Sequence, residues 1–204
     1  ALPAIAACVL TDEPVILRNV PDIADVCAML GIVESLNGKV EHLEPNVWKV
    51  QVPSPVASRP DAALCRQIRA SILFAGPVLA RHGEVELDPP GGDVIGRRRL
   101  DTHFFGFRKL GASVEAEQTY RVLTRQLRGT EVFLDEASVT ATENLVMAAV
   151  LATGRTTIFN AACEPHVQGL CHMLVQMGAH IEGIGSNTLH IDGVEALHGT
   201  DYTI

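Results

Sequence analysis

Three apolar stretches decide the fold: residues 1–10 (ALPAIAACVL), 70–79 (ASILFAGPVL) and 141–151 (ATENLVMAAVL). They recur at a spacing of about 70 residues, and each ends in Val-Leu. Apolar side chains cover nearly the whole circumference of each predicted helix, which is typical of a helix buried in a core. Repetition at a fixed period indicates a structural unit used more than once.

The same series of elements follows each apolar helix. A short strand comes first (15–17, 85–87, 157–159), and a more amphipathic second helix follows it (22–36, 100–110, 164–177). Two strands complete each unit, the last of them at 47–52, 120–124 and 188–192. Gly38, Gly111 and Gly178 stand where the second helices end, as left-handed C-caps do.

The predicted fold class is therefore α/β, in an inside-out arrangement. Three helix-strand-helix-strand-strand units, at about 1–62, 63–136 and 137–204, form one barrel-like domain with buried helices and outer sheets. Strand 47–52 (VWKVQV) alternates as expected when one face of a sheet is wet.

Composition excludes several classes of protein. With 47% hydrophobic and 20% charged residues, the 204-residue chain is an ordinary globular one. A net charge of −8 argues against general nucleic-acid binding, which needs a basic face. No apolar run approaches the ~20 residues of a membrane span. The five cysteines include no C-x-x-C pair, which fits reduced thiols in the cytoplasm. The eight histidines show no metal-ligand spacing, and we expect neither a metal nor a cofactor.

Residues 88–103 (DPPGGDVIGRRRLDTH) contain an acid and a run of cations on a glycine-rich loop. Asp93 is the acid, and Arg97, Arg98 and Arg99 follow it. Such a loop can handle an anionic substrate. It can equally be a solvated surface loop, in which an aspartate beside glycine is common.

Several short motifs carry a resemblance to a known family. They are Arg69-Ala70-Ser71, the loop PGGDVIGRR (90–98), Asp101 with His103, SVTAT (138–142), and NAA (160–162) with Glu164-Pro165. Through essentially its whole length the sequence resembles the enolpyruvyl transferases, in the branch that acts on UDP-N-acetylglucosamine. The loop PGGDVIGRR favours this branch over the shikimate-pathway branch.

The resemblance implies two similar domains, each of three repeats around buried helices, with the active site between them. This chain resembles the continuous domain. The partner domain is absent from the sequence, as is the Lys-Asn pair that the family carries just before the position of Ala1. Because the chain also lacks a start methionine, we expect it to be a fragment.

The implied reaction moves the enolpyruvyl group of phosphoenolpyruvate to a sugar hydroxyl by addition and then elimination of phosphate. In peptidoglycan synthesis it is the first committed step, and it needs no cofactor. Asp93 stands where many members have a reactive cysteine that donates a proton and is alkylated by fosfomycin. A carboxylic acid with a raised pKa can also donate a proton, but it is a poor substitute for a thiolate nucleophile. We therefore expect resistance to fosfomycin.

The resemblance also implies a set of site residues. The catalytic ones are Asp93, Arg98 and Arg69; those at the substrate are Arg69, Arg98, Arg99, Leu100, Asp101, Thr102, Glu136, Ala137, Ser138, Val139 and Thr140.

Simpler structural interpretations of these residues stay open. Asp101 can be a helix cap, as can Ser138 or Thr140. His103 is expected to be packed and hydrogen-bonded rather than catalytic. Glu136, a carboxylate, cannot pair with a diphosphate, so its contact would be through the backbone. A non-catalytic nucleotide-sugar binding or regulatory domain is the main functional alternative, and the shikimate-pathway transferase is another.

Overall fold

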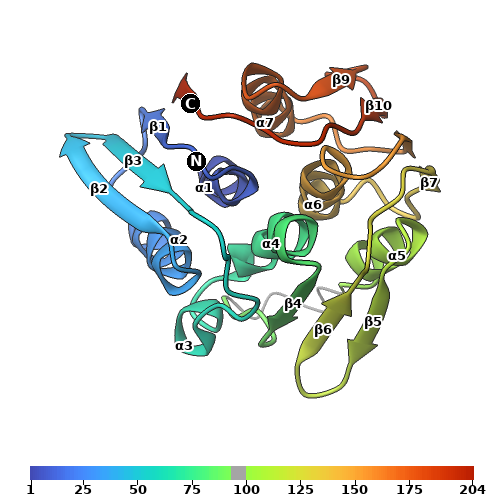
Figure 1. Ribbon diagram of the computed structural model, residues 1–204, viewed down its shortest axis with the longest axis horizontal. Helices are drawn as coiled ribbons and strands as arrows, with labels where there is room; N and C mark the ends of the chain where they lie inside the picture. Colours follow the sequence, from blue (N-terminus) through green and yellow to red (C-terminus); the bar gives the residue numbers. More distant parts are fainter. Residues whose placement is uncertain (93–99) are drawn as a thin grey trace.

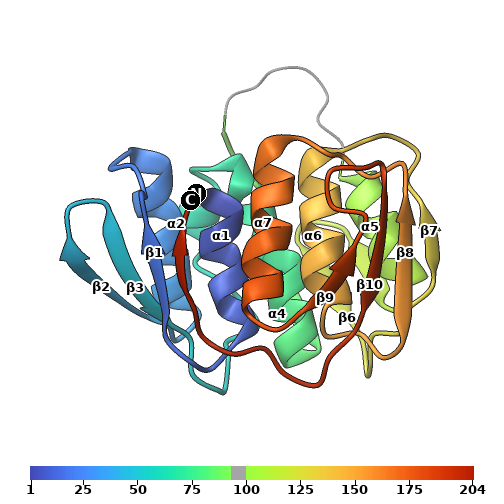
Figure 2. The ribbon, with the colours of Figure 1, turned by 90° about the horizontal axis from the view of Figure 1, so that it is seen from above.

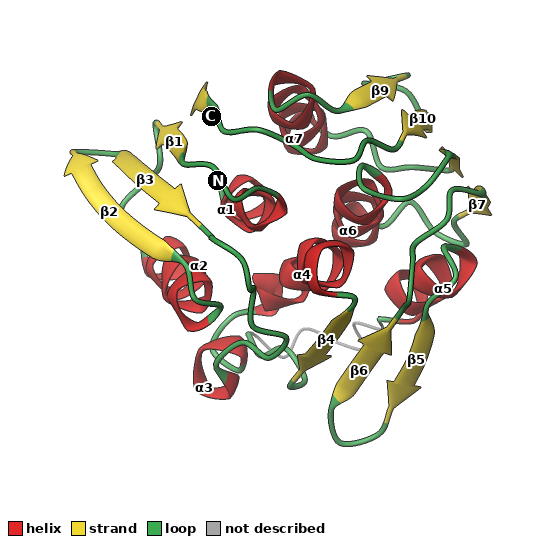
Figure 3. Cartoon of the chain, in the orientation of Figure 1, coloured by secondary structure: helices red, strands yellow, loops and turns green. Residues whose placement is uncertain are grey.

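The computed structural model describes residues 1–92 and 100–204. The helices are seen nearly end-on in Figure 1, with α1, α4 and α6 at the centre, and the strands of three sheets lie around them (Figures 1 and 3). The central helices are buried, α6 along most of its length. Their apolar circumference explains this position, because every face of such a helix must be covered by another element.

Each unit contains the predicted series of elements. The first has α1 (Leu2–Ala7), a 3₁₀ turn η1 (Cys8–Leu10), β1 (Val15–Arg18), α2 (Ala24–Ser35), β2 (Lys39–Glu44) and β3 (Val47–Gln51). The second has α3 (Ala62–Cys65), η2 (Arg69–Phe74), α4 (Ala75–His82), β4 (Glu84–Leu87), α5 (Asp101–Lys109), β5 (Ser113–Ala116), β6 (Tyr120–Leu123) and β7 (Glu131–Phe133). The third has α6 (Val139–Ala149), β8 (Arg155–Phe159), α7 (Pro165–Gln176), β9 (His180–Glu182), β10 (Thr188–Asp192) and β11 (Asp201–Thr203).

Two of the three sheets include a strand from a neighbouring unit. Their strand orders are β11-β1-β3-β2, β4-β6-β5 and β7-β8-β10-β9. β7 pairs in parallel with β8 of the next unit, and β11 pairs in parallel with β1 of the first. At the corresponding place in the second sheet, the N–H of Glu86 donates to the carbonyl of Ser58 at 2.9 Å. These exchanges join the units into a ring of separate sheets rather than one closed barrel. The division at about 62 and 136 stays a prediction, since the sheets cross it.

Two details differ from the sequence prediction. The helix expected over 70–79 is a 3₁₀ turn followed by α4 from Ala75. Pro77 explains the late start, because proline is tolerated in the first turn of a helix, where no N–H partner is needed. In the first unit the left-handed residue after α2 is Asn37, with φ 69°, and not Gly38. Gly38 instead packs against Val33, where a Cβ would lie 2.5 Å from a methyl carbon. Gly111 and Gly178 have φ of 92° and 101°, as predicted.

The two chain ends lie side by side in both views (Figures 1 and 2). The N–H of Ile204 donates to the carbonyl of Arg18 at 3.1 Å, and the Asn19 side chain donates to the carbonyl of Ile204 at 2.8 Å. Within the described residues, no helix is long and apolar enough to cross a membrane.

Candidate functional site

The starts of α4 and α5 meet at one buried side chain, Asn144 in the second turn of α6. Its Oδ1 accepts from the N–H of Gly76 in the first turn of α4 at 2.8 Å. Its Nδ2 donates to the carbonyl of Ile72 at 2.9 Å and lies 3.0 Å from Nδ1 of His103 in α5. Gly92 lies against Arg69 at the start of η2, and Leu100 is the N-cap residue of α5, so both residues that flank the undescribed part of the predicted acid loop lie at helix starts. Because helix N-termini attract negative charge, this end of the domain suits an anionic ligand.

His103 is packed and hydrogen-bonded, as predicted. Its side chain is 2% exposed, and Nε2 lies 3.2 Å from the hydroxyl of Thr140. Burial, and to a smaller extent the charge of Arg69, lower the pKa of His103 to about 3. The imidazole is therefore neutral at pH 7.

Thr102, beside His103 in the first turn of α5, is tied to the segment that precedes α6. Its hydroxyl donates to Oδ1 of Asp135 at 2.8 Å and lies 3.4 Å from Oε1 of Glu136. Thr102 is 4% exposed, so its hydroxyl is not accessible to a ligand. A role for Thr102 and Glu136 in binding substrate stays a prediction, and for Thr102 it would have to involve the backbone.

Ser138, Val139 and Thr140 form the half-buried start of α6. Ser138 is the N-cap residue, as one of the open interpretations has it, but its hydroxyl makes no capping hydrogen bond. Among the described residues, the N–H groups of Val139 and Thr140 have no hydrogen-bond acceptor. Unpaired N–H groups at the first turn of a helix are the groups that bind phosphate in many proteins. Ala137, directly before them, is exposed.

Asp101 is exposed and is the first residue of α5. Leu100, and not Asp101, occupies the N-cap position of this helix. A carboxylate in the first turn still interacts favourably with the helix dipole.

The base of the predicted acid loop is packed tightly against the end of α3 and the start of η2. A Cβ on Gly91 would lie 1.6 Å from the carbonyl oxygen of Arg66, so only glycine fits there. Gly92 has φ 89° and lies against the backbone of Arg69. These contacts fix where the loop leaves the domain. The predicted site residues Asp93, Arg98 and Arg99 lie outside the described residues, as does Arg97.

Arg69, Leu100 and Asp101 are brought together around one hollow of about 360 Å³. The other residues that line it are Pro89, Pro90, Phe104, Arg108, Ala116 and Tyr120. Phe104 and Tyr120 are in contact there, with ring centroids 5.1 Å apart. The hollow therefore combines two guanidinium groups with an aromatic wall, directly beside the loop base.

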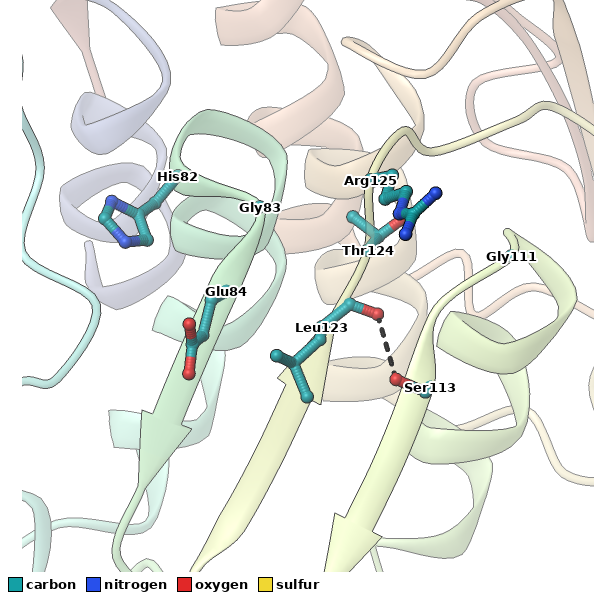
Figure 4. Close-up of a pocket in the computed structure, with 8 residues that line it drawn as sticks. All are labelled: His82, Gly83, Glu84, Gly111, Ser113, Leu123, Thr124 and Arg125. Carbon is teal, nitrogen blue, oxygen red and sulfur yellow. Dashed lines mark hydrogen bonds between the residues drawn. The ribbon is translucent and has the colours of Figure 1, made fainter.

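A larger hollow of about 550 Å³ lies at the opposite ends of the helices (Figure 4). His82 and Gly83 end α4 there, and Gly111 follows α5. The carbonyl of Leu123 accepts a hydrogen bond from the Ser113 hydroxyl at 3.4 Å on its wall. Helix C-termini carry partial negative charge, which disfavours an anion. Size alone therefore does not identify the site.

Sequence reasoning missed Asn144, whose bonds connect α4, α5 and α6. A signal was available in the run Thr142-Glu143-Asn144, which is polar within an otherwise apolar helix. All three side chains are buried. Thr142 is also engaged, since it donates to the carbonyl of Ser138 and accepts from the N–H of Ala162.

Comparison with known proteins agrees with this arrangement. The sequence profile of the family described as EPSP synthase (3-phosphoshikimate 1-carboxyvinyltransferase) matches residues 1–204. The chain is 57% identical over 204 residues to the UDP-N-acetylglucosamine 1-carboxyvinyltransferase of Treponema denticola, and 52% identical to that of Bradyrhizobium diazoefficiens. Both alignments cover 100% of this chain, but 48% and 47% of the relatives. The chain thus spans about half the length of the curated relatives it matches.

Two solved structures share the fold. The enolpyruvyl transferase NikO from Streptomyces tendae superposes with a TM-score of 0.84 at 20% identity, covering 100% of this chain and 48% of that one. EPSP synthase from Acinetobacter baumannii gives 0.76 at 16% identity, with 99% and 47% covered. The predicted fold class, with helices inside and sheets outside, is confirmed.

Proposed function

Because the chain belongs to the EPSP synthase (3-phosphoshikimate 1-carboxyvinyltransferase) family, we propose that it is one domain of an enolpyruvyl transferase. The enzyme transfers the enolpyruvyl group of phosphoenolpyruvate to the 3-hydroxyl of UDP-N-acetylglucosamine and releases phosphate. The observation that carries this proposal is 57% identity, along the whole chain, to a relative named for that reaction. The activity belongs to peptidoglycan synthesis in the cytoplasm. A second domain completes the site.

In this proposal, the domain contributes an anion-binding face and a proton donor. Asp93 protonates the methylene carbon of phosphoenolpyruvate while the sugar hydroxyl gives its proton to a base and attacks the neighbouring carbon. Loss of a proton and of phosphate then restores the double bond. Arg69 and Arg98 hold phosphate or carboxylate through paired hydrogen bonds, as guanidinium groups do. Support comes from the position of Arg69 in the hollow beside the loop base.

The nucleotide part of the substrate occupies the start of α6 and the neighbouring start of α5. The N–H groups of Val139 and Thr140 are oriented for an anion, and the dipole of α6 favours the diphosphate there. Glu136 contributes through its backbone, since its carboxylate turns toward Thr102. Leu100, Asp101, Thr102 and residue 99 line the uridine side.

Phosphate release tests the proposal. The intact protein, given phosphoenolpyruvate and UDP-N-acetylglucosamine, should release phosphate and form the enolpyruvyl sugar nucleotide in equal amounts. The 204-residue chain alone should release none, and turnover by it would refute the requirement for a second domain. Asp93→Asn should lower kcat by about 10²–10⁴-fold, the usual contribution of a general acid. Asp25→Asn, at an exposed carboxylate on α2, is the matched control and should not change kcat.

The same assay separates the enzyme from the non-catalytic alternative. An intact protein that binds UDP-N-acetylglucosamine without releasing phosphate would be a binding or regulatory protein. Turnover with shikimate 3-phosphate in place of the sugar nucleotide would favour the shikimate branch instead. The names of the relatives speak against that outcome.

Resistance to fosfomycin follows from the carboxylate at position 93. Thiolate attack opens the epoxide of the drug, and a carboxylate is a much weaker nucleophile. The intact wild-type protein should keep its activity after long incubation with fosfomycin, whereas Asp93→Cys should lose activity with time. Time-dependent inactivation of the wild type would contradict this expectation. Asp25→Cys is the control for alkylation at an exposed site.

A further inference from the structure

The hydrogen bonds around Asn144 determine which atom of His103 carries the proton. Oδ1 of Asn144 accepts from the N–H of Gly76, so its Nδ2 is the atom that faces Ile72 and His103. An amide nitrogen only donates. Nδ1 of His103 must therefore accept, and the neutral ring carries its proton on Nε2.

This tautomer fixes the role of the Thr140 hydroxyl in turn. Nε2–H of His103 donates to Oγ1 of Thr140, at 3.2 Å. The hydroxyl is consequently an acceptor in that bond, and its own proton is left for another partner. Within residues 1–92 and 100–204, no acceptor is found for that proton. The start of α6 is half-buried, so an acceptor from outside the domain can reach it.

We propose that His103 is a positioning residue that turns the Thr140 hydroxyl proton toward a phosphoryl oxygen of the nucleotide at the start of α6. This inference rests on the proposed function for the presence of a nucleotide there. It adds a side-chain donor to the backbone N–H groups of Val139 and Thr140. The combined set offers only donors, which suits a diphosphate, an acceptor-only group.

Conservative variants in the intact protein test the hydroxyl. Thr140→Val keeps the shape and removes the proton, whereas Thr140→Ser keeps a hydroxyl. Thr140→Val should raise the KM for UDP-N-acetylglucosamine, and the Kd for UDP alone, by about tenfold with kcat nearly unchanged, as expected for one charge-assisted hydrogen bond. Thr140→Ser, which keeps the proton, should bind UDP more tightly than Thr140→Val. An unchanged Kd for UDP in Thr140→Val would overturn the inference.

The positioning role of His103 has its own measurement. Long-range ¹H–¹⁵N spectra should show neutral His103 protonated on Nε2 at pH 7, and a ring protonated on Nδ1 would overturn the inference. His103→Gln should raise the Kd for UDP in the wild-type background but add little in Thr140→Val, because both act through one bond. Independent, additive effects would show that His103 acts on stability alone.

These outcomes separate the inference from the proposed function. Turnover by wild type with no effect of Thr140→Val on the Kd for UDP removes the inference and leaves the function. Loss of UDP affinity in Thr140→Val, in a protein that never releases phosphate, supports the inference and removes the proposed reaction.

Discussion

Glu143 and Asn144 are neighbours in the sequence, on one helix, and both are buried, yet their surroundings are opposite. Asn144 is 0% exposed, and its amide oxygen and nitrogen both have partners on other elements. Glu143 is 2% exposed, and its Oε1 has no hydrogen-bond partner among the described residues. Nε2 of the exposed His166 lies 4.0 Å from Oε1, which is too long for a hydrogen bond.

The difference shows what a buried polar group does for a fold. A satisfied group specifies how elements meet, since each bond it makes has one geometry. An unsatisfied group destabilises the folded state, because it has lost water without gaining a partner. One helix thus carries a residue that defines the junction of α4, α5 and α6 and a residue that weakens the protein at neutral pH.

The largest effect on stability is expected from removing the hydrogen bonds of Asn144. Asn144→Leu leaves the N–H of Gly76, the carbonyl of Ile72 and Nδ1 of His103 without their partner. We expect the free energy of unfolding to fall by about 3 kcal/mol or more, since each unsatisfied buried group costs roughly 1–3 kcal/mol. For a chain of this size, that lowers Tm by roughly 6–12 °C. A thermal melt followed by circular dichroism measures it, and a Tm within ~2 °C of wild type would contradict it.

Removing the buried carboxylate of Glu143 should stabilise the protein, by an amount that depends on pH. Burial, chiefly, raises the pKa of Glu143 from 4.5 to about 7. A raised acid pKa means that the folded state binds the proton more tightly, so stability falls as pH rises from 4.5 to about 7. Glu143→Gln removes this dependence. It should be close to neutral at pH 5 and more stable by about 1–3 kcal/mol at pH 8.

Denaturant unfolding of wild type and Glu143→Gln across this pH range makes the measurement. His166→Gln is the matched control: its ring is exposed, and its removal should change stability by less than ~0.5 kcal/mol. A gain of the same size at pH 5 and pH 8 would contradict an origin in the charge of Glu143.

The smallest effect on stability is expected at Thr156, where a neutral hydroxyl, and not a charged carboxylate, lacks a hydrogen-bond partner. The hydroxyl of Thr156 in β8 is fully buried and, like Oε1 of Glu143, has no partner in the described chain. Thr156→Val keeps the β-branched shape and should stabilise by about 1 kcal/mol, equally at pH 5 and pH 8. Thr157→Val, which loses a hydroxyl bonded to His190 at 3.1 Å, should not stabilise and serves as the control.

Much of the fold could be predicted because its signal is local. Apolar periodicity located the helices, and alternation located the strands. The pairings of β7 with β8 and β11 with β1 escaped prediction, since they join strands of different units and leave no trace in either strand alone. Asn37 replaced the predicted glycine cap because asparagine also tolerates a left-handed conformation.

In the candidate site too, local features could be predicted from the sequence and long-range contacts could not. The predicted residues 100–102 and 136–140 do lie at helix starts that face one another, because the repeat places each start at the same end. The link between them could not be predicted. Asn144 lies 68 residues from Gly76 and 41 from His103, so their contact is a property of packing. Roles for the predicted site residues in binding or catalysis stay predictions.

The pairing of β11 with β1 has a consequence for folding during synthesis on the ribosome. Register pairs such as Ile16 with Asp201 are separated by nearly the whole chain. Contacts of such long separation close slowly, since the intervening chain must first be ordered. During synthesis β1 emerges long before its outer partner β11, because the residues between them must be translated first. The ring therefore closes after translation of this segment, and until then the edge of β1 is open to other chains.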